Sequence, residues 1–176
     1  MNLPNKLTML RIILIPIFII LLTKGYSIIA AVLFILAAAT DALDGHLARK
    51  YNLITNFGKI MDPLADKLLV TSALICLVEL GQVAGWMVIV ILAREFIITG
   101  LRAVAAGEGI VIAAGKSGKI KTVLQMLALS VILLQNWPFS LFTKQPIGIY
   151  ILWIAVIMTI YSGIEYIIKN KEIFRK

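Results

Sequence analysis

The sequence predicts an all-α integral membrane protein with six transmembrane helices. Three observations lead to this prediction: a very apolar composition, six uncharged runs along the chain, and a one-sided distribution of lysine and arginine. Hydrophobic residues fill 61% of the 176 positions and charged residues only 15%, and the mean hydropathy is +0.99. These values lie far outside the composition of soluble globular domains. Most of the chain is therefore expected to lie in a membrane.

Uncharged runs mark where the six helices are expected. In chain order they cover residues 12–23, 25–40, 68–78, 80–93, 122–143 and 145–164. The first run follows Lys6 and Arg11, as in a signal peptide, but no Ala-x-Ala cleavage site follows near Thr23, so we interpret it as a retained span. Because a crossing helix needs roughly 20 residues, the second helix is expected to extend to about Gly45 and the third to begin near Met61.

Basic residues give the orientation. Six spans would place all but two of the 17 lysines and arginines on one side, leaving only Lys24 and Lys144 on the other. The positive-inside rule then predicts a multi-pass protein of the cell (plasma) membrane with both termini in the cytoplasm. The same dispersal between apolar spans, instead of a concentrated basic surface, excludes nucleic acid as a partner.

Nothing in the chain indicates a second domain. We see no internal repeat and no long polar linker, so residues 1–176 are expected to form one membrane domain. Cys76 is the single cysteine, which excludes a disulfide framework and a thiolate zinc site.

Four of the nine acidic residues fall in one short segment. It reads Asp41-x2-Asp44-Gly45-x2-Ala48-Arg49-x8-Gly58-x3-Asp62-x3-Asp66. Carboxylates within apolar helices are costly in lipid, so these are expected to face a water-filled cavity, on the cytoplasmic side, and to pair with cations.

The spacing of the acids suggests how they meet. Asp41 and Asp44 are i, i+3 at the end of the second helix, and Asp62 and Asp66 are i, i+4 on the third, so each helix offers two carboxylates on one face. Hard oxygen donors suit Mg²⁺ or Mn²⁺. Pro63 is expected in the first turn of the third helix, with Asp62 as its N-cap.

Two other interpretations of the acids remain open. A structural salt-bridge cluster would pair them with Arg49, Lys59 and Lys67. A divalent-cation channel or transporter would line a conduction path with them. Their position at one membrane face, beside Gly45-x2-Ala48-Arg49, disfavours the channel and suits a ligand that contains phosphate.

This acidic segment resembles the complete signature of the CDP-alcohol phosphatidyltransferases, with every fixed position filled. The resemblance implies a six-helix membrane enzyme, usually a homodimer, that transfers a phosphatidyl group from CDP-diacylglycerol to an alcohol and releases CMP. It also implies two divalent metal ions, Mg²⁺ or alternatively Mn²⁺, in a cytoplasm-facing polar cavity.

Position by position, the resemblance assigns roles to the segment. Metal ligation falls on Asp41, Asp44, Asp62 and Asp66, and Asp66 is also the expected base for the acceptor hydroxyl. Contacts with CDP-diacylglycerol fall on Gly45, Arg49 and Thr55, and on Asn5 and Thr8 in the segment before the first span. Helix capping is the alternative role for Asn5 and Thr8.

The acceptor alcohol is expected to contact the second half of the chain. There the order Ala93-Arg94-Glu95-Phe96-x3-Gly100-Leu101-Arg102, followed by Gly118-Lys119-Ile120-Lys121-Thr122, is similar to bacterial phosphatidylglycerophosphate synthases, which use sn-glycerol 3-phosphate. The resemblance places Arg94, Lys119 and Lys121 around the acceptor phosphate, with Arg102 and Lys116 as further candidates. Inositol phosphate, serine and phosphatidylglycerol are the alternative acceptors, and topology-setting loop charge is the alternative role for any one lysine.

Overall fold

The computed structural model describes residues 3–50, 56–110, 112, 113 and 115–171. Its elements in chain order are α1 (Leu3–Thr23), α2 (Ser27–Lys50), α3 (Asn56–Glu79), α4 (Gly85–Gly107), α5 (Lys116–Leu133), the short 3-10 helix η1 (Phe139–Leu141) and α6 (Ile147–Lys169). No strand occurs in these described ranges. The predicted all-α class is therefore confirmed.

Helix boundaries test the predicted spans. α2 continues to Lys50 and α3 begins at Asn56, so both extend into the acidic segment as expected. The fifth run was predicted too long, because α5 ends at Leu133 and the chain then turns through Gln135 and Asn136, whose φ angles are 56° and 62°. A right-handed helix cannot continue through left-handed backbone.

Two expectations about the start of α3 are wrong. Pro63 lies inside the helix and not in its first turn, and Asp62 is therefore not an N-cap. The helix begins earlier, at Asn56. Proline at position 63 removes the backbone hydrogen bond that residue 63 would otherwise donate within the helix.

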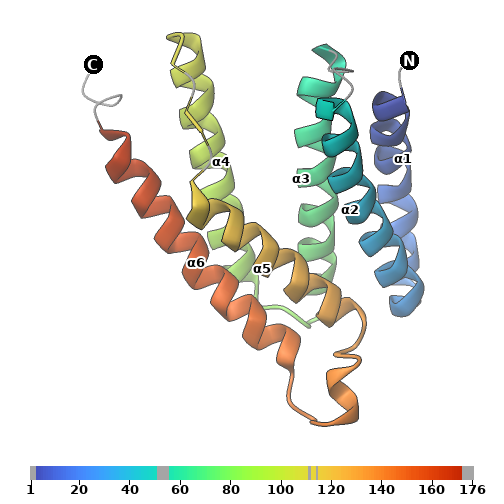
Figure 1. Cartoon of the computed structure of the whole chain (residues 1–176). Coiled ribbons are helices and arrows are strands. Elements are labelled where there is room, and N and C mark those ends of the chain that lie inside the picture. The colour runs from blue at the N-terminus through green and yellow to red at the C-terminus, as the bar shows by residue number, and fades with distance from the viewer. Residues whose placement is uncertain (1–2, 51–55, 111, 114, 172–176) are drawn as a thin grey trace.

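The helices are arranged as two sets of three (Figure 1). α1 packs on α2 and α3, while α5 packs along α6, which also contacts α4. α2 and α3 contact α5, and α3 contacts α4, which joins the two sets. α1 begins and α6 ends at the same end of the bundle, where α2 also ends and α3 begins (Figure 1). The acidic segment therefore lies at the end shared by the first and last helices.

Apolar side chains occupy both the inside and the outside of the bundle. Phe18 and Phe34 are fully buried with ring centroids 6.0 Å apart, and Leu74 and Leu77 pack in the same core. Large apolar residues such as Ile89, 68% exposed, cover the outer surface. By length and composition, two helical segments of the described chain could cross a membrane: Asn5–Thr23 and Ile147–Lys169.

Candidate active site

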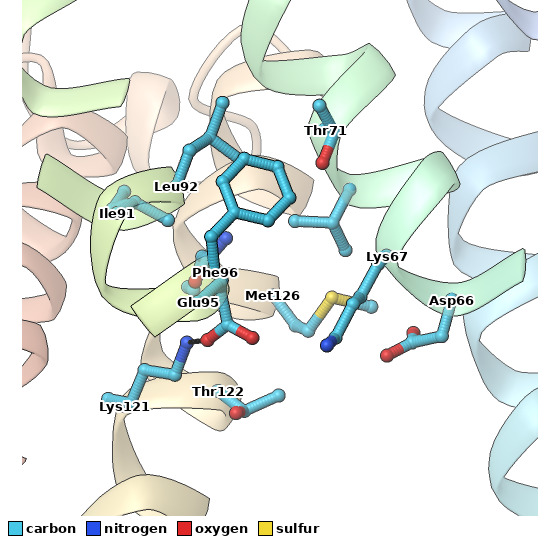
Figure 2. Close-up of a pocket in the computed structure, with 12 residues that line it drawn as sticks. Asp66, Lys67, Thr71, Ile91, Leu92, Glu95, Phe96, Lys121, Thr122 and Met126 are labelled. Atoms are coloured by element: carbon cyan, nitrogen blue, oxygen red, sulfur yellow. Dashed lines mark hydrogen bonds and ion pairs between the residues drawn. The ribbon is translucent and has the colours of Figure 1, made fainter. Parts of the chain in front are cut away.

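A cavity of about 90 Å³ lies between α3, α4 and α5 (Figure 2). Its polar lining consists of Asp66, Lys67, Thr71, Glu95, Lys121, Thr122 and Gln125, and its apolar lining of Val70, Ile91, Leu92, Phe96 and Met126. The polar groups come from three different helices, so only the folded chain brings them together. Two of them, Asp66 and Lys121, are site residues predicted from sequence.

Asp66 reaches this cavity because of its register on α3. Ala65 and Leu69 on that helix are buried, which fixes the rotation of the helix and leaves Asp66 half-buried in the cavity wall. Figure 2 shows the Asp66 carboxylate and the Lys67 ammonium on the same side of α3, facing the space that Glu95 and Lys121 border. Two carboxylates, those of Asp66 and Glu95, and two ammonium groups thus line one small cavity.

Asp62 lies one turn before Asp66 and is held by α1. The hydroxyl of Thr8 donates a hydrogen bond to Oδ1 of Asp62. Thr8 is only 1% exposed, and Asn5 and Arg11, three residues before and after it on α1, are buried as well. Asn5 and Thr8 lie inside α1, which begins at Leu3, so they do not cap its start. This polar face of α1 is instead turned into the protein beside the acids.

Glu95 is the centre of a largely buried ion cluster. Lys121, whose side chain is 4% exposed, donates to Oε1 of Glu95, and Nη1 of Arg94 lies 3.3 Å from the same oxygen. Lys67 donates from Nζ to the hydroxyl of Thr99 on α4 at 2.5 Å. Buried ammonium and guanidinium groups need such partners, because an unpaired buried charge is strongly destabilising. The cluster fixes the Lys121 ammonium at the cavity wall.

The other basic residues predicted for the acceptor lie elsewhere. Arg102 donates from Nε to the hydroxyl of Tyr166 at 3.2 Å, and its guanidinium carbon lies 5.3 Å from the Tyr166 ring centroid. Arg94 and Arg102 line a second cavity of about 180 Å³ between α4, α5 and α6. Lys116 and Lys119 are exposed and line neither cavity. The five predicted residues therefore do not form one group.

Several predicted residues fall where side chains are not described. Asp41, Asp44, Gly45 and Arg49 lie in the last turns of α2, and Thr55 lies outside the described residues. Among the residues whose side chains are described, no three His, Cys, Asp or Glu form a group that could hold a metal ion. The four-carboxylate metal site remains a prediction, with Asp62 and Asp66 as its two described members.

Two charged residues of the cavity, Lys67 and Glu95, had no functional role in the sequence prediction. Lys67 was considered only as an ion-pair partner of the acids, and Glu95 only as part of a motif. Both carry a charge inside or beside an apolar helix, which is the signal that identifies functional residues in membrane segments. Gln125 follows Lys121 by four residues and so shares its helix face, a second signal available from spacing.

Comparison with known proteins identifies the family. The model of the CDP-alcohol phosphatidyltransferase family matches residues 1–161. A protein of Bacillus subtilis (strain 168), named CDP-diacylglycerol–glycerol-3-phosphate 3-phosphatidyltransferase, is 50% identical over 97% of this chain and 96% of its own length. A protein of the same name from Rickettsia typhi is 43% identical over 98% of this chain and 99% of its own length. Another from Haemophilus influenzae is 41% identical over 94% of this chain and 91% of its own length. The chain belongs to the CDP-alcohol phosphatidyltransferase family.

Proposed function

We propose that this protein transfers the phosphatidyl group of CDP-diacylglycerol to sn-glycerol 3-phosphate, which gives phosphatidylglycerophosphate and CMP. The observation that carries the proposal is the cavity lined by the carboxylate of Asp66 and by the ammonium groups of Lys67 and Lys121. A carboxylate can take the proton of an acceptor hydroxyl, and two ammonium groups can hold an acceptor phosphate. The names of relatives 50% to 41% identical over nearly the full chain support this acceptor.

The reaction forms one bond to phosphorus and breaks another. The acceptor hydroxyl oxygen attacks the phosphorus that carries the diacylglycerol, and the bond from this phosphorus to the CMP oxygen breaks. Asp66 takes the hydroxyl proton as the new bond forms, which requires only that its carboxylate reach the hydroxyl. Lys121 from α5 and Lys67, beside Asp66 on α3, hold the acceptor phosphate in the cavity, which leaves the hydroxyl of the short acceptor within reach of Asp66 and the phosphorus.

The acids suit a pair of divalent cations. Carboxylate oxygens are the ligands that Mg²⁺ and Mn²⁺ prefer, and Asp41, Asp44, Asp62 and Asp66 would hold the two ions. When bound, such ions neutralise the pyrophosphate and the departing CMP. The Thr8 hydroxyl orients the Asp62 carboxylate, as hydrogen-bonded partners of metal-binding carboxylates commonly do.

The donor substrate belongs at the end of the bundle that holds the acids. Gly45, Arg49 and Thr55 are proposed to contact the CDP group, together with Asn5 and Thr8 from the buried polar face of α1. In this proposal all six α-helices cross the plasma membrane with the site and both termini in the cytoplasm, and the protein is a homodimer. The exposed apolar side chains support a lipid-facing surface, so the acyl chains of the substrate can stay in the bilayer.

Two lysines of α5 provide a matched test of acceptor binding. Lys121→Gln removes an ammonium from the cavity wall and should raise the KM for glycerol 3-phosphate about tenfold to a hundredfold, because a hydrogen bond to a charged group contributes about 1.5–3 kcal/mol. Lys119→Gln changes an exposed lysine two residues away and should leave this KM within about twofold, as surface charges contribute little.

CMP release from CDP-diacylglycerol in detergent, at varied glycerol 3-phosphate, measures both values. An unchanged KM in Lys121→Gln, or an equal rise in both variants, would refute this placement of the acceptor phosphate.

A further inference from the structure

Arg94 occupies a narrow space between α5 and α6 that two glycines provide. A Cβ atom added at Gly163 of α6 would lie 3.2 Å from Cγ of Arg94, and one added at Gly118 of α5 would lie 3.4 Å from its Nη2. The Arg94 side chain is 13% exposed. The two glycines therefore leave space for opposite parts of one largely buried side chain, its stem and its guanidinium.

Glu95 connects Arg94 to the acceptor cavity. Nη1 of Arg94 lies 3.3 Å from Oε1 of Glu95, the oxygen that also accepts the hydrogen bond from Lys121. Nε of Arg94 is buried and has no hydrogen-bond partner in the described part of the chain. The position of Arg94 therefore depends on its packing against the two glycines and on its contact with Glu95.

We infer that Gly163 and Gly118 are positioning residues for the acceptor site, an inference that rests on the proposed function. The absence of side chains at these two positions lets Arg94 reach Glu95. Arg94 and Lys121 then share one carboxylate oxygen, which fixes the Lys121 ammonium at the wall that faces Asp66. A displaced Arg94 would move Glu95, and with it the ammonium that binds the acceptor phosphate.

The contacts distinguish this role from ordinary helix packing. Gly148, on the same helix as Gly163, would place a Cβ 2.6 Å from Cγ1 and 3.0 Å from the backbone nitrogen of Ile132, so it serves the close approach of α6 to α5. At Gly163 the atom met is on the Arg94 side chain, and among the described residues no backbone atom of another helix lies within 4 Å of the added Cβ. Glycine is also the less stable choice inside a helix. A side chain at position 163 would thus displace Arg94 and would not push α6 away from α5.

Four alanine variants test the inference. Gly163→Ala should raise the KM for glycerol 3-phosphate about tenfold, since the shift of one charged hydrogen-bonding group costs about that factor in affinity. Gly118→Ala, with its longer 3.4 Å contact, should raise the same KM by a smaller factor. The KM for CDP-diacylglycerol should not change in either. Gly100→Ala, where an added Cβ meets nothing within 4 Å, should match the wild type.

Gly148→Ala separates packing from positioning. It should lower the midpoint of thermal unfolding and leave the KM for glycerol 3-phosphate unchanged, because its contacts are with Ile132 and Val131. In a Glu95→Gln background, Gly163→Ala should add little to the acceptor KM, since Glu95 transmits the effect of Arg94 to Lys121. If Gly163→Ala raised the acceptor KM by the same factor in the Glu95→Gln background as in the wild type, the inference would be contradicted.

The outcomes separate the inference from the function on which it rests. If wild type and Gly100→Ala turn over glycerol 3-phosphate, and Gly163→Ala has the same KM for it as wild type, the inference is refuted and the proposed function stands. The same conclusion follows if Gly163→Ala raises the KM for glycerol 3-phosphate and the KM for CDP-diacylglycerol together. If Gly163→Ala does not fold, the acceptor KM of Gly118→Ala decides in the same way. If neither wild type nor Gly100→Ala uses glycerol 3-phosphate, the proposed function itself is refuted.

Discussion

Asp66→Asn should lower kcat for CMP release by about a thousandfold, because a positioned general base contributes about 10²–10⁴. Asparagine has nearly the same shape as aspartate, but its amide cannot take the acceptor proton and binds cations weakly. The side chain stays half-buried in the same cavity wall, so the fold has no reason to change. The loss should therefore appear in kcat and not in the amount of folded protein.

Glu79→Gln is the matched control for this change. Glu79 is exposed at the far end of the same helix, where removal of its charge affects no group of the cavity. Its kcat should stay within about twofold of wild type, as is usual for surface substitutions. If Asp66→Asn retained a similar share of activity to Glu79→Gln, Asp66 would not be the base.

Removal of divalent cations should abolish CMP release. With excess chelator the rate should fall at least about a thousandfold, because charge neutralisation at a reacting phosphate supplies several kcal/mol. Mg²⁺ in excess of the chelator should restore the rate, and Mn²⁺ should restore it in part. The physical reason is that the two acidic pairs predicted at the ends of α2 and α3 offer hard oxygen donors near the departing CMP.

Metal binding can also be measured without turnover. A cation that binds only the folded protein raises its stability, so Mg²⁺ should raise the thermal unfolding midpoint of wild type. The same shift should be smaller in Asp62→Asn, whose folded structure keeps the Thr8 contact through the amide oxygen. Full activity in excess chelator would contradict the metal proposal, whatever the unfolding data show.

The fold could be predicted largely from charge and length. The short second and third runs required helices that continue into the acidic segment, and α2 and α3 do so. The end of α5 could not be predicted, because the run after Leu133 remains uncharged while Gln135 and Asn136 adopt left-handed backbone angles. Hydropathy reports the surroundings of a residue and not its dihedral angles.

The candidate site was predictable where spacing alone determines position. Asp62 and Asp66 share a face of α3 because they are i, i+4. The basic residues were harder, since Lys119 and Lys121 are i, i+2 and point to different faces of α5. Of these two lysines, only Lys121 lines the cavity between α3, α4 and α5. The partners of Glu95 also could not be predicted, because they come from different helices.

The most direct test of the account is a comparison of acceptors with purified protein, CDP-diacylglycerol and Mg²⁺. Glycerol 3-phosphate, inositol phosphate, serine and phosphatidylglycerol are supplied one at a time, and CMP and the lipid product are identified by mass spectrometry. The account predicts CMP and phosphatidylglycerophosphate in equal amounts with glycerol 3-phosphate, and both products at a rate about a thousandfold lower with Asp66→Asn. Turnover with another acceptor in place of glycerol 3-phosphate, or no CMP with any acceptor, would contradict it.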